Sequence, residues 1–368
     1  MKGKKLVSII DMYIIKKFLG TYIFSIILII SIAVVFDINE RLDKFLAHEG
    51  ILKQIIFDYY FNFIPFYANT FSSLFVFISV IFFTSKLAEN SEIIAMLSNG
   101  MSFKRLLRPY MISAAIISLA TFLLGSFVIP PANKDRIDFQ NKYFRDKSTS
   151  SAREVQVQIG KGSILYLESY SRSRGSGTNI ALDNFDGKTL VSRVVAEKAT
   201  YDSAYNWKLS NYAIREFKDS KEFVSSGTEL DTIIPITPED LLVSINDFEI
   251  MTTPQLHTYI NRQKSRGLAS VGDVSITNFE VEYHKRFASL FSAFILTIIG
   301  VTLSSRKVKG GMGLNIGIGL GLSFGYIVFM TISSSFAVSG TMSPFMAVWL
   351  PNFVYIFIAA FLYTRAPN

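Results

Sequence analysis

The chain alternates between long uncharged segments rich in apolar residues and one long polar region. A helix needs about 20 such residues, at 1.5 Å per residue, to cross the hydrocarbon of a bilayer. Four uncharged segments have this length or nearly so: Phe18–Phe36, Tyr59–Ser85, Pro109–Asn133 and Phe287–Ser305. Gly310–Thr364 is also uncharged and is long enough for two helices, with a turn at Ser339–Ser343. The pattern predicts six transmembrane helices, three before the polar region and three after it.

The polar region, about 150 residues in the middle of the chain, changes to a two-residue period. Val155, Val157 and Ile159 alternate with glutamines, which is typical of a half-buried strand. Further short runs are separated by turn residues and lie at Ile164–Leu167, Asn179–Leu182, Leu190–Ala196 and Trp207–Ile214. Strands at this spacing predict an antiparallel sandwich, jelly roll or barrel at roughly residues 140–245.

After these strands a helix is predicted, with Thr253 as its N-cap, Pro254 in its first position and its end near Gly267. The chain is thereby divided into an N-terminal membrane half, a β domain, a connecting helix with linker, and a C-terminal membrane half, at residues 1–135, 136–250, 251–283 and 284–368. Two interpretations of the β domain are open. It is a rigid spacer, or it is a platform whose open strand edge pairs with a similar domain in another chain.

The formal net charge is +8, which could suggest nucleic-acid binding. The basic residues, however, lie mostly in short segments next to the predicted spans, on one side of the membrane. The basic residues lie before the first span (Lys2, Lys4, Lys5, Lys16, Lys17), between the second and third (Lys86, Lys104, Arg105, Arg108), between the fourth and fifth (Arg306, Lys307, Lys309) and after the sixth (Arg365). The opposite short loops are acidic or uncharged. The positive-inside rule therefore places both termini in the cytoplasm and the β domain outside it, in the periplasm if the bacterium has two membranes. The first apolar segment lacks a cleavage site and is predicted to be a retained span.

Several chemistries are disfavoured by composition. There is no cysteine, so no disulfide, cysteine-based metal site or thiol nucleophile is expected. The three histidines (His48, His257, His284) are far apart in sequence, and we predict no metal site and no cofactor. The predicted spans carry no charged residue and no catalytic motif, which argues against an intramembrane enzyme.

The basic loop between the second and third spans contains the most specific local signal, Ser91–Gly100. Ser91 fits an N-cap, Glu92 suits the positive end of the helix dipole, and Gly100 fits the left-handed residue after a helix. An apolar stripe follows on a helix too short to span a membrane: Ile93, Met96 and Leu97. Either this stripe packs against the inner leaflet or the bundle, or it docks into a groove of a cytoplasmic partner, with Glu92 pairing with a basic residue there.

At this point the chain resembles the permease subunits of the lipopolysaccharide-export ABC transporter, the LptF/LptG group. The motifs that carry the resemblance occur in the family's order: Asp11-Met12-Tyr13-Ile14, Asn90–Gly100, Ile129-Pro130-Pro131-Ala132-Asn133, Met251-Thr252-Thr253-Pro254-Gln255-Leu256 with Tyr259-Ile260, and His284-Lys285-Arg286-Phe287-Ala288. One departure follows the last motif, where the family often has a proline and this chain has Ser289-Leu290-Phe291.

The resemblance implies a membrane protein, an α-helical bundle of six transmembrane helices with an inserted periplasmic antiparallel β-jellyroll domain. It implies a non-catalytic permease subunit that extracts lipopolysaccharide from the inner membrane and passes it to a periplasmic bridge. ATP would be hydrolysed by a separate chain. The implied partners are a cytoplasmic ABC ATPase dimer, a paralogous permease or second copy, a periplasmic jellyroll bridge protein, a single-span partner and lipopolysaccharide itself.

The resemblance also assigns candidate residues. The ATPase-coupling residues would be Glu92, Ile93, Met96, Leu97 and Gly100. Lipopolysaccharide would enter between the first span of one permease and the fifth span of the other. The fifth span has a glycine every fourth residue, which permits close packing at this gate: Gly313, Gly317, Gly321 and Gly325. The alternative is a packing groove within the same chain.

Arg41 and Lys44 follow the first span on the outer side, where the family has cations that contact the lipid phosphates. The alternative is that they only extend to the membrane surface, as basic side chains at span ends do. At the level of the whole protein, the alternative is a mechanotransmitting ABC subunit, or an anchor, that acts on periplasmic partners without carrying lipid. The motifs do not separate the F-like from the G-like member.

Overall fold

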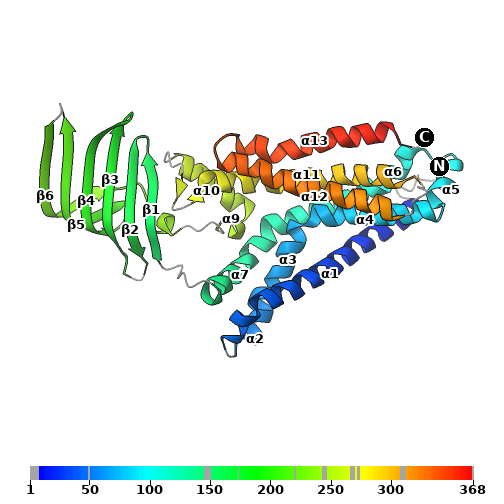
Figure 1. The fold of residues 1–368 in the computed structure, drawn as a ribbon, viewed down its shortest axis with the longest axis horizontal. Coiled ribbons are helices and arrows are strands. Elements are labelled where there is room, and N and C mark those ends of the chain that lie inside the picture. The colour runs from blue at the N-terminus through cyan, green and yellow to red at the C-terminus, as the bar shows by residue number, and fades with distance from the viewer. Residues whose placement is uncertain are drawn as a thin grey trace, which may run out of the picture. The chain divides into compact units, whose positions relative to one another are not determined.

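The computed structural model describes residues 8–48, 50–144, 151–172, 174–218, 221–242, 247–265, 270–271, 274–306 and 312–366. It has two compact units, a helical unit of Met1–Arg136 with Val281–Asn368 and a β unit of Ile137–Glu280 (Figure 1). The predicted helix end at Gly267 lies outside the described residues, as do five of the lysines used for the topology: Lys2, Lys4, Lys5, Lys307 and Lys309. The separate connecting segment 251–283 stays a prediction.

Long helices make up the helical unit. The N-terminal half contains α1 (Ile9–Leu46), α2 (Leu52–Gln54), the π-helical η1 (Ile55–Tyr60), α3 (Phe61–Thr70), α4 (Ser72–Glu89), α5 (Glu92–Ser98), α6 (Phe103–Leu123), the π-helical η2 (Leu124–Val128) and α7 (Ile129–Tyr143). The C-terminal half contains α11 (Ile276–Ser304), α12 (Met312–Val338) and α13 (Pro344–Thr364). Figure 1 shows the first turn of α1, helix α5 and the last turn of α13 at the same end of this unit.

The six predicted spans are confirmed. Among the described residues, six helices are long and apolar enough to cross a membrane: Ile9–Leu46, Ser72–Glu89, Phe103–Tyr143, Ile276–Ser304, Gly313–Val338 and Pro344–Thr364. The turn between the last two is also where the sequence placed it. Ser343 caps α13 by accepting from the Met346 N–H at 3.4 Å, and Pro344 occupies the first position.

Two spans differ in detail from the sequence prediction. The uncharged segment Tyr59–Ser85 does not form one helix, because the chain leaves the helical conformation at Phe71 and divides into α3 and α4. The third span extends past Asn133, because α6, η2 and α7 follow one another without a break from Phe103 to Tyr143.

Helix α4 is the most enclosed span of the helical unit, with α1 and α12 packed against it. Small residues on its neighbours allow this approach. A Cβ at Gly300 of α11 would lie 2.7 Å from Val80 Cγ1, and a Cβ at Gly319 of α12 would overlap the Ile81 side chain. Hydroxyls bond between the same helices, as between Ser25 and Ser79 at 3.1 Å. Close backbone approach and hydrogen bonds of this kind stabilise helix pairs where lipid is as apolar as the side chains.

One antiparallel sheet forms most of the β unit. Its strands are β1 (Ser151–Gly160), β2 (Ser163–Ser171), β3 (Ser176–Asp186), β4 (Thr189–Tyr201), β5 (Asn206–Lys218) and β6 (Lys221–Ile233). Each pairs with its neighbour in sequence, so the six form a meander. The inserted antiparallel β domain is confirmed, and five of its strands were predicted. The connections of the described strands are those of a meander, however, and not those of a jellyroll.

One face of the sheet carries the core of the β unit. Val157, Leu167 and Trp207 lie on this face with at most 1 % of their surface exposed. The face is covered by the segment after β6, by α8 (Pro238–Leu241) and by the first residue of α11, Ile276. The Trp207 indole donates to the Ile236 carbonyl at 3.0 Å, which satisfies its buried polar atom.

The remaining elements of the β unit are α9 (Asp247–Ile250), α10 (Thr253–Ser265), β7 (Ser270–Val271) and β8 (Val274–Ser275). The predicted cap of α10 is wrong by one residue. Helix α10 begins at Thr253, so Thr252 is its N-cap. The Thr252 carbonyl accepts from the Leu256 N–H, and the Gln255 side chain accepts from the Thr252 N–H at 2.9 Å and from the Thr252 hydroxyl at 2.8 Å. Gln263 is buried and donates to Asp240 at 3.0 Å, which fixes α10 to α8.

The contact at Gly300 predicts a stability difference between two glycines of the helical unit. Gly300→Ala should lower the free energy of unfolding by about 1–3 kcal/mol, because Val80 is rigid and buried and overpacking costs this much. Gly321→Ala is the matched control, since no atom lies within 4 Å of its added Cβ and alanine is favoured in helices by up to about 1 kcal/mol. Unfolding of the purified protein in detergent measures both. Equal effects of the two substitutions would contradict the packing argument.

Candidate functional site

Helix α5 ends in a tight turn that requires a glycine. Gly100 has φ +84°, its N–H donates to the Leu97 carbonyl at 3.0 Å, and the Met101 N–H donates to the Met96 carbonyl at 3.3 Å. These two bonds form a Schellman motif, which satisfies the last carbonyls of a helix. The left-handed conformation expected at Gly100 is therefore present.

The start of α5 differs from the expectation. Ser91 stands in the N-cap position, and its carbonyl accepts from the Ala95 N–H at 2.9 Å, but its side chain makes no capping hydrogen bond. The reason is its backbone, which has φ +60°, whereas a capping side chain requires an extended N-cap residue.

The apolar stripe of α5 packs against the helical unit of the same chain. Ile93 is fully buried, and Met96 and Leu97 pack partly buried against the same hydrophobic cluster. The opposite side of α5 is exposed and includes Ile94, of which 49 % is accessible. Among the residues predicted for coupling, Glu92 and Gly100 are therefore accessible to another chain, while Ile93 is not.

Glu92 contacts the first helix. The Tyr13 hydroxyl donates to Glu92 Oε2 at 3.2 Å, and Asn90 Nδ2 lies 3.4 Å from the other carboxylate oxygen. Glu92 stays half-buried and Tyr13 exposed, so this contact lies at the surface, where a partner chain can compete for the carboxylate.

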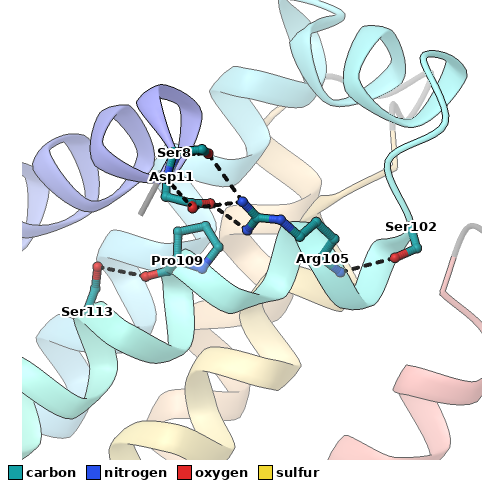
Figure 2. Close-up of polar contacts among 6 residues, drawn as sticks. All are labelled: Ser8, Asp11, Ser102, Arg105, Pro109 and Ser113. Carbon is teal, nitrogen blue, oxygen red and sulfur yellow. Dashed lines mark hydrogen bonds and ion pairs between the residues drawn. The ribbon is translucent and has the colours of Figure 1, made fainter. Parts of the chain in front are cut away.

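An ion pair between a buried carboxylate and a half-buried guanidinium fixes α1 to α6 close to this contact. Arg105 makes a bidentate bond to Asp11, with Nη1–Oδ1 at 2.6 Å and Nη2–Oδ2 at 2.8 Å (Figure 2). Asp11 is 2 % exposed and also accepts from the Ser8 N–H at 2.8 Å, while Ser8 Oγ accepts from the Asp11 N–H. The same Asp11 carboxylate therefore caps the start of α1 and binds Arg105.

Local hydrogen bonds place Arg105 in the first turn of α6. Ser102 caps this helix by accepting from the Arg105 N–H at 3.3 Å, and Pro109 lies one turn further along (Figure 2). The Pro109 carbonyl accepts from the Ser113 hydroxyl at 3.0 Å. The ends of α1 and α6 on the α5 side are thereby held together.

A second polar cluster lies near the other end of α1. Asp37 is buried and accepts from Arg41 Nε at 2.8 Å, from the Tyr59 hydroxyl at 3.1 Å and from the Tyr60 hydroxyl at 3.0 Å. The Arg41 guanidinium also lies 5.8 Å from the centre of the Tyr59 ring. Arg41 is thus engaged by its own helix and by η1, while Lys44 is exposed one turn further along.

The four glycines of the predicted gate lie on an exposed face of α12. No atom of the described chain is within 4 Å of a Cβ added at Gly313, Gly317 or Gly321, and Gly325 has only the Tyr355 hydroxyl, at 3.2 Å. The packing groove within the chain is formed by a different glycine, Gly319, which meets Ile81 of α4. The gate itself stays a prediction.

The described residues contain no group of three or more His, Asp or Glu side chains placed to hold a metal ion. The polar clusters found here are pairs and networks that join helices.

Comparison with protein families accounts for nearly the whole chain. The model of the lipopolysaccharide export system permease LptF/LptG matches residues 12–365. The chain belongs to this family. It is similar to the lipopolysaccharide export system permease protein LptG of Escherichia coli strain K12, with 20 % identity over 362 residues, which cover 97 % of this chain and 98 % of the relative. The LptG of Escherichia coli O6:H1 strain CFT073 matches to the same extent.

The LptF/LptG motifs identified the start of α1 and the α5 segment, but they did not reveal the contacts that join these two elements. Asp11 and Arg105 are 94 residues apart, and the sequence assigned Asp11 to an entry motif and Arg105 to the basic loop. A signal was present, since Asp11 is the first acidic residue in a strongly basic N-terminal segment. The Asp37 cluster was missed for the same reason, because Tyr59 and Tyr60 come from a separate helix, η1.

The Asp11–Arg105 pair predicts an asymmetric mutational effect. Arg105→Gln should lower the free energy of unfolding by roughly 2–4 kcal/mol, because it leaves a buried carboxylate without its cation. Asp11→Asn combined with Arg105→Gln should restore part of this loss, since the buried charge is then removed as well. Denaturant unfolding of wild type and the two variants in detergent checks this. A double variant less stable than the Arg105→Gln single variant would contradict it.

Proposed function

We propose that this LptF/LptG-family chain is a permease subunit that takes lipopolysaccharide from the inner membrane and passes it to a periplasmic bridge. A separate ATPase would supply the energy. The observation that carries the proposal is the family match over residues 12–365, which includes both membrane halves and the inserted β unit. A mechanotransmitting subunit or an anchor without lipid transport is the competing function, and the complex described below separates the two.

The charge distribution supports a topology with α5 and both termini in the cytoplasm. Basic residues stand in the helices on either side of α5 in sequence: Lys86 in the last turn of α4, and Lys104 and Arg108 in the first two turns of α6. The positive-inside rule places such residues in the cytoplasm, and the β unit would then be periplasmic.

Helix α5 would dock on the ATPase with the face that the helical unit leaves exposed. The burial of Ile93 supports this division, because it fixes the helix and leaves Glu92 and Ile94 accessible. A basic residue of the ATPase would take the Glu92 carboxylate, in place of or together with the Tyr13 hydroxyl. Met96 and Leu97 would hold α5 at the angle that transmits ATPase closure to α4 and α6.

The lipid would enter beside α12 and meet cations at the outer end of α1. The exposed glycine face of α12 supports a gate, since three of its glycines have no neighbour among the described residues of the chain. Lys44 is the stronger candidate for a phosphate contact, because it is exposed whereas Arg41 is half-buried.

The periplasmic bridge would form at an edge of the sheet. Strand β6 is mostly exposed, and β5 is its strand partner within the described residues. An exposed edge presents backbone groups that can pair with a strand of another domain. This supports the platform over the spacer for the β unit, with a jellyroll partner as the occupant.

Glu92 is tested in the complex of this chain with its paralogue and the ATPase, reconstituted in lipid nanodiscs with and without lipopolysaccharide. Glu92→Lys should reduce the ATPase retained on the permease by about tenfold, because like charges then face each other. Tyr13→Phe is the matched control, since it removes the bond to Glu92 and leaves the carboxylate free for the partner.

Two outcomes would contradict parts of the proposal. If Tyr13→Phe and Glu92→Lys have equal effects, Glu92 acts only through Tyr13. If the wild-type complex hydrolyses ATP but lipopolysaccharide neither alters the rate nor leaves the membrane, the mechanotransmitting function replaces lipid transport.

Lys44→Gln should lower lipopolysaccharide retention by the complex about two- to fivefold without changing stability, as expected for one exposed ion pair. Lys53→Gln on α2 is the control with the same change of charge. Arg41→Gln should lower stability as well, because Asp37 is buried. Equal retention by the Lys44 and Lys53 variants would remove Lys44 from the site.

A further inference from the structure

A groove outside the proposed transport path lies between α6, α11 and α13. It has a volume of about 520 Å³, within the range of small-molecule sites in proteins. Three helix stripes line it: Lys104, Leu107, Arg108 and Met111 from α6, Ile295 and Ile298 from α11, and Ile356, Ala359, Ala360 and Tyr363 from α13. All these residues belong to the helical unit.

The groove is polar at one end and apolar along the rest of its length. Lys104 lies in the first turn of α6, and Met111 is two turns further, about 10 Å along the axis. Tyr363 lies near the end of α13, and a ring contact of 5.9 Å between Phe103 and Tyr363 places that end beside the start of α6. The cations and the tyrosine therefore share one end, while the remaining lining residues are aliphatic.

Among the described residues, no acidic side chain balances the charge of this end. Lys104 and Arg108 are both exposed, and neither makes an ion pair with a residue that the structure describes. No carboxylate is among the residues that line the groove. Two adjacent cations above an aliphatic channel complement a ligand with an anionic head and a hydrocarbon chain.

We propose that this groove binds a phospholipid whose headgroup carries a net negative charge. One acyl chain lies along Met111, Ile295 and Ile356, and the phosphate contacts Lys104 and Arg108. Ala360 is exposed and small, which leaves room for the chain. The assignment of this lipid to the cytoplasmic leaflet rests on the topology proposed above. The site itself does not depend on that topology. The lipid would join α6 to α13, the third span to the sixth.

Native mass spectrometry of the full chain in detergent tests this site with an equimolar mixture of phosphatidylglycerol and phosphatidylethanolamine. Wild type should retain phosphatidylglycerol in preference. Lys104→Gln with Arg108→Gln should lower that retention by about tenfold, as expected for two charge-assisted contacts. Ala360→Phe should lower it by a similar factor with no change of charge, because the ring fills the groove.

Lys16→Gln with Lys86→Gln is the matched control, since it removes two exposed cations elsewhere on the helical unit. Its retention of phosphatidylglycerol should stay close to that of wild type. The proposal is overturned if this control loses as much lipid as the Lys104 and Arg108 variant, if Ala360→Phe binds normally, or if wild type retains both lipids equally. Thermal unfolding of each variant confirms its folding, and Ala360→Leu replaces Ala360→Phe if the latter does not fold.

Discussion

The bidentate bond between Asp11 and Arg105 determines how the α5 end of the helical unit is assembled. A carboxylate that is 2 % exposed needs a cation and further donors, and here Arg105 of α6 supplies the cation while the Ser8 N–H supplies a further donor. Once α1 and α6 are fixed in this way, Tyr13 lies within reach of Glu92. Helix α5 lies between α4 and α6 in sequence, so it is held from both sides. Its exposed face then has one orientation relative to the spans.

The interior of the helical unit depends on small residues and hydroxyls more than on side-chain volume. Gly300 and Gly319 let α11 and α12 approach α4, and hydroxyl pairs such as Ser73 with Ser292, at 2.7 Å, join α4 to α11. The apolar residues face outward as often as inward, as the exposed residues of α1 and α12 illustrate. Hydropathy therefore identifies a span in the membrane but does not show which of its faces meets another helix.

Sequence patterns predicted the helices and strands that are determined by residues close together in the chain. The first strand was found because its residues alternate, and four more were found as short runs between turn residues. Strand β6 was missed because Phe223 and Val224 are adjacent and both exposed. The cap of α10 was misplaced because Thr252 and Thr253 are equally suited to it by type. At the candidate site, Glu92 and Gly100 were identified from a local motif. Their contacts with α1, and the Asp37 cluster, depend on helices brought together by folding, which a single sequence does not encode in its spacing.

Helix α1 has 38 residues, so it is about 57 Å long, nearly twice the thickness of the hydrocarbon. Asp11 and Asp37 anchor it to other helices at points 26 residues apart, a separation of about 39 Å. The helix is one uninterrupted rod between these anchors. A tilt of about 5° about the first anchor would move the second by roughly 3 Å, by simple leverage. A tilt that small, set at the α5 end, would therefore move the far end by about the length of a hydrogen bond.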